Sequence, residues 1–171
     1  GLPWVKPTDL NIGFEGVSNS EFYLTPDVKR ESQLIPKNSI LVCCIGNTAG
    51  KCSISNFNLS SNQQINSITF NYEIFPRYGL YYMDLFGRDL LKWINFVTLP
   101  IISKGQLSKQ QIIIPPKKEQ EKIYIHLDKI ISNLNALMNA EQKKIHLLYE
   151  YRQSLISSVV TGKIRITEDM I

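Results

Sequence analysis

The sequence has few residues of the kinds that build disulfide frameworks and metal sites. Its three cysteines, Cys43, Cys44 and Cys52, are too few and too clustered for a secreted disulfide framework, and none forms the Cys-x-x-Cys pair typical of zinc sites. The two histidines, His126 and His146, lie far from them in sequence. We therefore expect reduced thiols and no metal ligands in this chain.

Long hydrophobic runs and a strong excess of charge are also absent. The longest apolar run, Ile40–Ile45, is far shorter than the roughly 20 residues that a membrane-spanning helix requires. The opening segment GLPWVKPTDL lacks the basic and then apolar pattern of a signal peptide, so we expect a cytoplasmic protein with no membrane partner. The net charge of +4 permits an acidic partner such as DNA without demanding one.

One stretch, ILVCCIGNTAGKCS, resembles a nucleotide-binding loop at first sight. A phosphate-binding loop needs four residues between its glycines, whereas Gly46 and Gly50 are separated by three. Lys51 is followed by Cys52, which has no hydroxyl group for magnesium, and then by an apparent strand where a helix is required. The stretch instead predicts a turn between two strands, with Asn47 and a glycine at positive φ.

No other pattern indicates catalysis. Asp84 and Asp89 fit a helix surface better than a general acid and base pair, and the chain contains no Gly-x-Ser-x-Gly elbow. A catalytic Cys and His arrangement and an Asn-Pro-Pro-Tyr-like methyltransferase motif are likewise not visible. We therefore expect a non-catalytic protein that carries no cofactor of its own.

The first 116 residues read as short strands and turns interrupted by one helix. Apolar segments punctuated by Gly, Pro, Asn and Ser predict five strands, at Ile40–Ile45, Cys52–Ile54, Ile65–Phe70, Phe96–Ile102 and Ile112–Ile114. A helix is predicted over Arg77–Phe96, although Gly79 and Gly87 weaken its helical propensity. We expect an α+β fold, with a compact domain over residues 1–116 that holds a small, mostly antiparallel sheet.

The region over residues 117–171 is dominated by one long helix. Between Pro116 and Gly162 there is no Gly or Pro, and a helix is predicted over Glu119–Val160. Apolar residues recur there in steps of three and four, at Ile123, Leu127, Ile130, Leu134, Leu137, Leu148, Tyr151 and Leu155.

This heptad seam predicts that the helix pairs with another long helix. A helix of roughly 60 Å is too long for the preceding domain to cover, and the partner is either a second copy or another part of a longer protein. Glu141 and Lys144 occupy the two polar seam positions and are suited to fixing register. The alternative is a long core helix of a bundle, for which the chain supplies no second long helix.

Residues suited to nucleic acid are spread through the first domain. Amides at the turn SSNQQIN can pair with adenine edges, and basic side chains can contact phosphate or guanine. The candidates for DNA contact are Lys51, Gln63, Gln64, Asn66, Arg77, Arg88, Lys92, Lys104, Gln106 and Lys109. Each has an ordinary alternative, because amides in turns often satisfy backbone groups and scattered basic residues are usually solvated.

The segments Ser103–Ile123 and Arg152–Ile166, with the segments before them in this order, resemble one half of the DNA specificity subunit of type I restriction-modification systems. The segments that carry the resemblance are LPWVKPTDL, the hairpin ILVCCIGNTAGKCSI, SSNQQIN and YYMDLF. The most specific ones are SKGQLSKQQIIIPPKKEQEKI at Ser103–Ile123 and RQSLISSVVTGKIRI at Arg152–Ile166, which bracket the helical region. Family members usually carry a further strand before the Pro-Trp segment and two copies of the domain and helix, so the chain resembles a half-subunit or the C-terminal half of a longer one.

The resemblance implies a non-catalytic DNA reader. Its recognition domain would bind one half of a split double-stranded target through the major groove, and its helix would pair antiparallel with a counterpart and dock methyltransferase subunits. S-adenosylmethionine, ATP and magnesium would then be bound only by partner subunits, including the restriction subunit of the complex. A homodimer through the helix is the expected assembly.

Two other functions remain open at this point. The chain could be the specificity segment of a fused restriction enzyme and methyltransferase, which a methyltransferase motif in the neighbouring coding sequence would reveal. It could also be a coiled-coil adaptor with no DNA role, which would show no salt-dependent binding to DNA.

Overall fold

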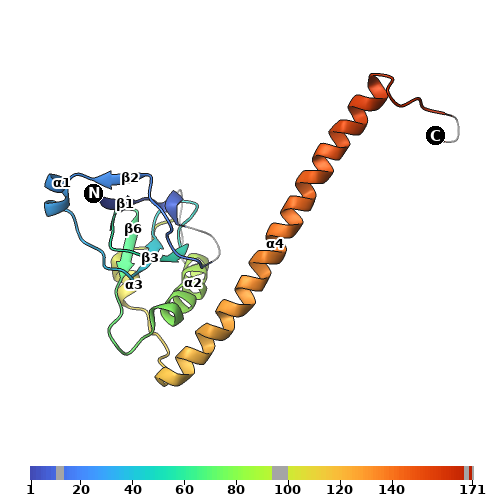
Figure 1. Cartoon of the computed structure of the whole chain (residues 1–171). Helices are drawn as coiled ribbons and strands as arrows, with labels where there is room; N and C mark the ends of the chain where they lie inside the picture. Colours follow the sequence, from blue (N-terminus) through green and yellow to red (C-terminus); the bar gives the residue numbers. More distant parts are fainter. Residues whose placement is uncertain (11–13, 94–99, 168–169, 171) are drawn as a thin grey trace. The chain divides into compact units, whose positions relative to one another are not determined.

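The computed structural model describes residues 1–10, 14–93, 100–167 and 170, except for the side chains of residues 29–31, 88 and 90–93. Figure 1 shows the elements in chain order: β1 (Leu2–Val5), the 3-10 turn η1 (Pro7–Asp9), β2 (Phe22–Leu24), α1 (Pro26–Glu31), β3 (Ile40–Cys43), β4 (Cys52–Ile54), β5 (Ser60–Ser61), β6 (Ile65–Ile68), α2 (Pro76–Trp93), α3 (Lys104–Ser108) and α4 (Lys117–Val160). The predicted α+β class is confirmed.

Contacts divide the chain into an N-terminal unit, Gly1–Asp128, and a C-terminal unit, Lys129–Ile171. The division expected after residue 116 coincides with the start of α4, whereas the contacts assign the first turns of that helix to the N-terminal unit. Among the described residues, no helix combines the length and apolarity needed to cross a membrane.

Strand β3 lies at the centre of an antiparallel sheet of order β4-β3-β6. Its four residues are all buried because successive side chains point to opposite faces of the sheet, and both faces are covered. Ile40 and Val42 join a core cluster with α2, while Leu41 and Cys43 join a second cluster with β1 and β6. This two-sided burial explains why the segment reads as a continuous apolar run.

The connection between β3 and β4 is the predicted hairpin. Cys43 donates its N–H to the carbonyl of Lys51 at 2.9 Å, and Gly50 donates to the carbonyl of Cys43 at 2.8 Å. Positive φ values occur at both glycines, 89° at Gly46 and 82° at Gly50, which relieves the steric cost of the turn. The expectation of positive φ at Asn47 is wrong, because the second glycine takes that role.

A second sheet has the order β2-β1-β5, with β1 antiparallel to β2 and parallel to β5. Three of the four strand pairings between named strands in the described structure are antiparallel, as the fold class predicts. Strands β1, β2 and β5 are not among the predicted strands and are only two to four residues long.

Helix α2 covers β3 and β4 with Leu80 and Met83, which are almost fully buried. Residues 94–96 of the helix expected over Arg77–Phe96 lie outside the described residues. Residues 96–99 of the strand expected over Phe96–Ile102 also lie outside them, and Ile101 forms an isolated bridge with Ile45.

The strand expected over Ile112–Ile114 is not formed, and side chains of α2 hold this part of the chain instead. Tyr78 donates its hydroxyl to the carbonyl of Ile113 at 2.8 Å, and Tyr82 donates to that of Gln111 at 3.0 Å. These two bonds attach the segment to α2.

The first turns of α4 are fixed to the rest of the N-terminal unit by a buried amide. Gln120 is fully buried, accepts the N–H of Phe75 at 3.0 Å, and donates to the carbonyls of Glu73 and Pro115, each at 2.9 Å. All three backbone groups are therefore satisfied by one side chain.

Candidate nucleic-acid interface

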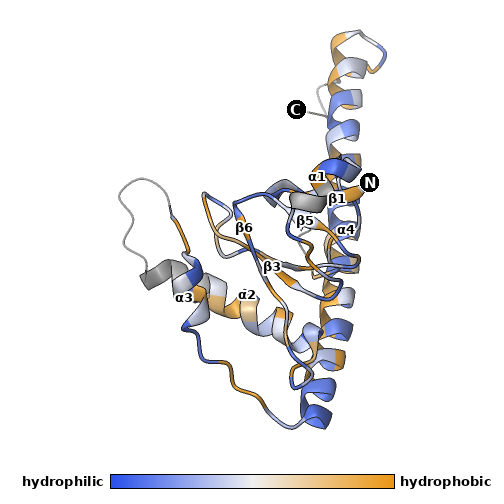
Figure 2. Cartoon of the chain, turned by 90° about the vertical axis from the view of Figure 1, so that its left-hand side faces the viewer, coloured by the Kyte–Doolittle hydropathy of each residue, from blue (hydrophilic) through white to orange (hydrophobic). Residues whose placement is uncertain are grey.

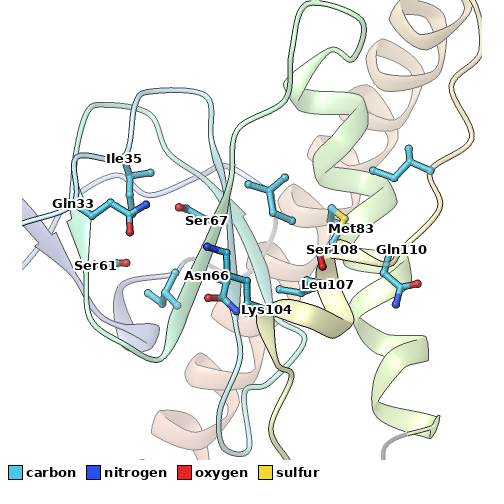
Figure 3. Close-up of a pocket in the computed structure, with 13 residues that line it drawn as sticks. Gln33, Ile35, Ser61, Asn66, Ser67, Met83, Lys104, Leu107, Ser108 and Gln110 are labelled. Carbon is cyan, nitrogen blue, oxygen red and sulfur yellow. The ribbon is translucent and has the colours of Figure 1, made fainter.

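A polar surface groove lies between the two sheets and α3 in the N-terminal unit. It consists of two cavities of about 370 and 420 Å³ that share Gln33, Ile35, Ser61, Ile65 and Asn66. We call it the amide groove and define it by its polar lining, Ser32, Gln33, Ser60, Ser61, Asn62, Gln63, Asn66, Ser67, Lys104, Ser108 and Gln110. Figure 3 shows part of it, with the amide of Gln33 reaching towards β6, where Asn66 and Ser67 lie.

The turn between β5 and β6 builds one wall of the amide groove. Asn62 accepts the N–H of Gln64 at 3.1 Å and donates its amide to the Gln64 side chain at 3.0 Å. The backbone of Asn62 also donates to the carbonyl of Val5 at 3.1 Å. These bonds fix the turn and leave the Gln63 side chain exposed at its tip.

Strand β6 contributes Asn66, whose side-chain nitrogen lies 3.0 Å from the sulfur of Cys44. Burial raises the pKa of the Cys44 thiol, and the bonds from Asn66 only partly oppose this shift. The thiol therefore stays protonated at neutral pH and acts as a fixed partner that orients the amide.

Helix α3 forms the opposite wall and is held by a capping box. Ser103 accepts the N–H of Gln106 at 3.2 Å, and the Gln106 side chain accepts the N–H of Ser103 at 2.8 Å. Leu107 is buried in the core below, which leaves Lys104 exposed at the groove. Gln110 donates its side chain to the carbonyl of Gln106 at 2.8 Å.

The lining of the amide groove is chemically suited to the edges of bases. Its described side chains are amides, hydroxyls, one lysine and apolar residues, with no carboxylate among them. Amides supply both a donor and an acceptor, and the lysine supplies positive charge for phosphate or guanine. Among the described residues there is no cluster of three or more side chains that could hold a metal ion.

Three of the predicted contact residues converge on the amide groove, namely Gln63, Asn66 and Lys104. The others do not line it. The side chains of Gln64 and Gln106 form hydrogen bonds in a turn and in a helix cap, and Lys51 lies half-buried at the hairpin. The side chains of Arg88 and Lys92 lie outside the described residues. Asn62 and Gln110 lie in segments quoted above but were not among the predicted contact residues, and Gln33 lies in none of those segments.

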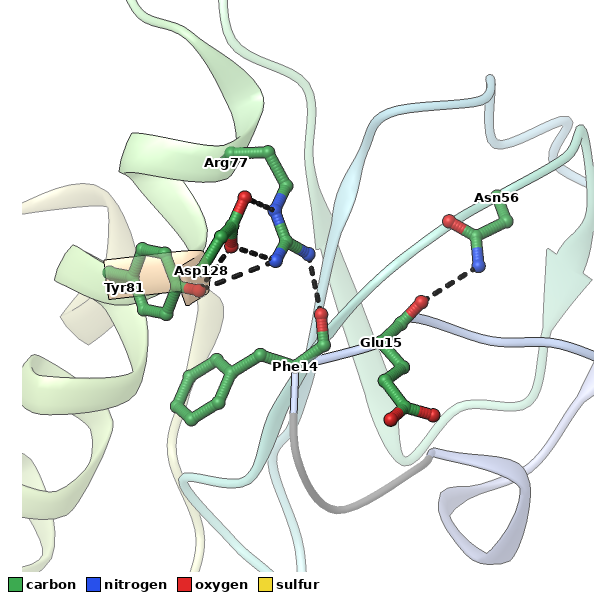
Figure 4. Close-up of polar contacts among 6 residues, drawn as sticks. All are labelled: Phe14, Glu15, Asn56, Arg77, Tyr81 and Asp128. Atoms are coloured by element: carbon green, nitrogen blue, oxygen red, sulfur yellow. Dashed lines mark hydrogen bonds and ion pairs between the residues drawn. The ribbon is translucent and has the colours of Figure 1, made fainter. Parts of the chain in front are cut away.

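Arg77 occupies a different place from the amide groove. Figure 4 shows its guanidinium donating to both oxygens of Asp128, with an Nε–Oδ2 distance of 3.3 Å, to the carbonyl of Phe14 and to the hydroxyl of Tyr81. Tyr81 also donates to Asp128. This cluster joins α2 to the first turns of α4 within the N-terminal unit, so Arg77 is engaged in internal contacts.

The protonation states in this cluster are set by burial and by the ion pair. Burial alone would lower the pKa of Arg77, but the neighbouring Asp128 carboxylate outweighs it and raises that pKa. Burial, reinforced by donation to Asp128, raises the pKa of the Tyr81 hydroxyl well above its ordinary value of 10.0. Arg77 is therefore charged and Tyr81 neutral at any physiological pH.

The C-terminal unit carries an unpaired hydrophobic seam along α4. Ile130, Leu134, Leu137, Leu148, Tyr151 and Leu155 are between 39 and 62% exposed. Ile123 and Leu127, in the first turns of the helix, are half-buried in the N-terminal unit. Figure 2 shows hydrophobic positions recurring along the helix among hydrophilic ones.

Residues 1–147 match the family described as type I restriction modification DNA specificity domain. The curated specificity subunit of the type I restriction enzyme EcoR124I/EcoR124II from Escherichia coli is 26% identical over 167 residues. That match covers 92% of this chain and 41% of the relative, so the chain spans about two fifths of the relative's length.

Two solved structures share the fold. One, from a study of complex assembly and conformational transition of the type I R-M system, has a TM-score of 0.74 and 20% identity and covers 92% of this chain and 38% of that chain. The other is the HsdS subunit from Thermoanaerobacter tengcongensis, with a TM-score of 0.65 and 19% identity over 96% of this chain and 38% of that one.

Proposed function

Because the chain belongs to the family of type I restriction modification DNA specificity domains, which are non-catalytic, we propose that it reads one half of a bipartite double-stranded DNA target. The observation that carries the proposal is the amide groove, which lies within the region that matches the family. The Escherichia coli relative is named as a type I specificity subunit, which supports the same proposal.

The amide groove would act as the base-reading surface. Sequence is read by hydrogen bonds and apolar contacts to base edges, and the major groove offers a distinct pattern for each base pair. Asn66 and Gln63 present amides, Lys104 presents a cation, and the turn and capping bonds hold their backbones in place. A surface held in this way loses little conformational entropy when it meets DNA.

Helix α4 would serve as the spacer and docking element. Its seam leaves apolar side chains exposed in the single chain, and burial against a second long helix would remove them from water. We infer antiparallel pairing, with Glu141 and Lys144 at mid-seam, and docking of methyltransferase subunits on the paired helices. Those subunits would bind S-adenosylmethionine, and the restriction subunit with its ATP and magnesium would join through them.

The proposal is tested by methylome sequencing of the host with and without the gene. We expect one interrupted motif that is methylated only when the gene is present. A methylome that does not change, measured with the modification subunits expressed, would count against a role in DNA recognition.

Salt dependence of binding provides a second test on the chain itself. Affinity for a duplex that contains the motif is expected to fall steeply with salt, because phosphate contacts release counterions. Lys104→Gln is expected to lower the slope of log affinity against log salt by about one. Lys143→Gln, an exposed site in the C-terminal unit, is the matched control. A coiled-coil adaptor without DNA binding would show no such slope for any variant.

A further inference from the structure

The amides of the groove differ in how much of their hydrogen-bonding capacity is already used. Asn62 uses both its oxygen and its nitrogen on Gln64, and Gln110 uses its nitrogen on the carbonyl of Gln106. Asn66 gives one N–H to Cys44. Among the described side chains of the groove, Gln33 and Gln63 are the amides with no hydrogen bond at either atom.

Both glutamines lie close to backbone that is held by hydrogen bonds. Gln33 lies two residues before Ile35, which exchanges backbone bonds of 2.7 and 2.9 Å with Leu59. Gln63 lies at the tip of the turn that Asn62 closes. Both side chains are exposed and both line the 420 Å³ cavity of the amide groove. They therefore present complete amide edges towards one surface, next to backbone that is hydrogen-bonded.

The chemistry of that surface favours one kind of base pair. A free carboxamide pairs bidentately with adenine, since its oxygen accepts from N6 and its nitrogen donates to N7. Ile35 and Ile65 also line the cavity but are only 3 and 6% exposed, so the two amides carry the discrimination between bases. Cytosine is best read by a carboxylate, and the described lining of the groove contains none.

We propose that Gln33 and Gln63 are specificity-determining residues, each of which reads an adenine, so that A·T pairs dominate the part of the half-site facing the 420 Å³ cavity. This inference rests on the proposed function, because it takes the amide groove as the base-reading surface. It goes further by naming the residues and the bases they distinguish.

The test begins with selection of duplexes from a random pool by the whole 171-residue chain. Adenines in the enriched sequence are then replaced one at a time by 7-deazaadenine, which lacks the N7 acceptor. We expect about a tenfold loss of affinity at each of two adenines, the effect of breaking a bidentate pair. Gln33→Met and Gln63→Met, which keep side-chain length, should each lose a similar factor and become insensitive to 7-deazaadenine at one position.

Gln142→Met, an exposed glutamine of α4 outside the groove, is the matched control and should bind like the wild type. The inference is overturned if the chain enriches a sequence but tolerates 7-deazaadenine at every adenine, or if both variants retain the original selectivity. In that case the proposed function stands with other reading residues. If no sequence is enriched, the proposed function fails together with the inference.

Discussion

At the scale of single residues, Asp128 is the centre of the contacts between α2 and the start of α4. It accepts hydrogen bonds from Arg77 and Tyr81, and both members of the ion pair are about two-thirds buried. Asp128→Asn keeps the shape but leaves the Arg77 guanidinium without its counter-charge. We expect a loss of about 2 kcal/mol in the free energy of unfolding, measured with urea and tryptophan fluorescence.

The control for this change is an ion pair on the same helix that is open to water. Glu141 and Lys144 are 3.8 Å apart and more than half exposed. In a sample dilute enough to be monomeric, Glu141→Gln should alter the unfolding free energy by less than about 0.5 kcal/mol, since solvent screens such pairs. Equal effects of the two substitutions would show that the Arg77 cluster contributes no more than a surface pair.

Tyr81 gives the same cluster a predicted pH dependence. Its folded-state pKa is raised above the unfolded value of about 10, so the folded state holds the proton more tightly. The resulting stability is complete below about pH 10 and is lost as the pH rises through the folded-state pKa. We expect the stability difference between wild type and Tyr81→Phe to shrink when urea unfolding is repeated at about pH 11.

Tyr72→Phe is the matched control for this experiment, because Tyr72 is 81% exposed and lies outside the cluster. A difference between wild type and Tyr81→Phe that stays constant from neutral to alkaline pH would contradict the assigned role of the hydroxyl.

The residues of the candidate site were only partly predictable from the sequence. Gln63 is predictable because it sits in a turn between predicted strands, where exposed amides are common. Asn66 belongs to the same quoted segment but lies on β6. The charge of Arg77 suggests a DNA contact, but its partner Asp128 is 51 residues away and no local pattern reveals it. Gln33 was missed because it lies in a loop without a motif, and only the fold brings it beside β6.

At the scale of elements, Gly87 sets how closely α2 approaches the hairpin turn. A Cβ at Gly87 would lie 2.4 Å from the carbonyl oxygen of Gly50 and 3.1 Å from its Cα. Both atoms are backbone, so no side-chain rotation relieves the clash. We expect Gly87→Ala to destabilise the N-terminal unit by about 1 to 3 kcal/mol, even though alanine favours helices by about 1 kcal/mol.

Gly105→Ala is the corresponding control in α3, where the nearest atom to an added Cβ is the Ser103 hydroxyl at 4.0 Å. It should leave stability unchanged or raise it by up to about 1 kcal/mol, because alanine reduces the entropy of the unfolded chain. Both values come from thermal or urea unfolding. A neutral Gly87→Ala would show that α2 can move away from the hairpin without cost.

Local sequence patterns predict some elements of the fold and leave others undetected. The two glycines of α2 weaken its helical signal, yet close packing against Phe70 and Gly50 requires them. The hairpin and α4 have strong local patterns, an apolar run with glycines and a heptad repeat, and both were predicted. Strand β5 consists of two serines and pairs with β1, more than 50 residues earlier, so only the tertiary structure defines it.

At the scale of the whole molecule, the exposed apolar seam of α4 is the feature that most favours pairing with a second helix. The helix is 44 residues long, and its seam leucines in the C-terminal unit are 39 to 59% exposed. Exposed seams of this kind are buried by a second helix, and a second copy of this chain offers an identical seam. An antiparallel pair would set Glu141 of each copy near Lys144 of the other.

Two adjacent leucines allow this pairing to be tested with two variants that have the same amino-acid composition as each other. Leu148 belongs to the seam and Leu147 does not, yet their exposures are similar, 57 and 63%. We expect the wild type to sediment as a dimer at tens of micromolar. Leu148→Glu should weaken dimerisation at least about a hundredfold, because the two-fold axis places the substitution on both helices and the buried apolar area is lost twice. Leu147→Glu should change it only slightly.

A dimer must also read the same half-site on opposite strands, so its methylated motif should be an interrupted palindrome. A monomeric wild type, or a motif with two different halves, would instead require a second recognition domain on another chain or another segment.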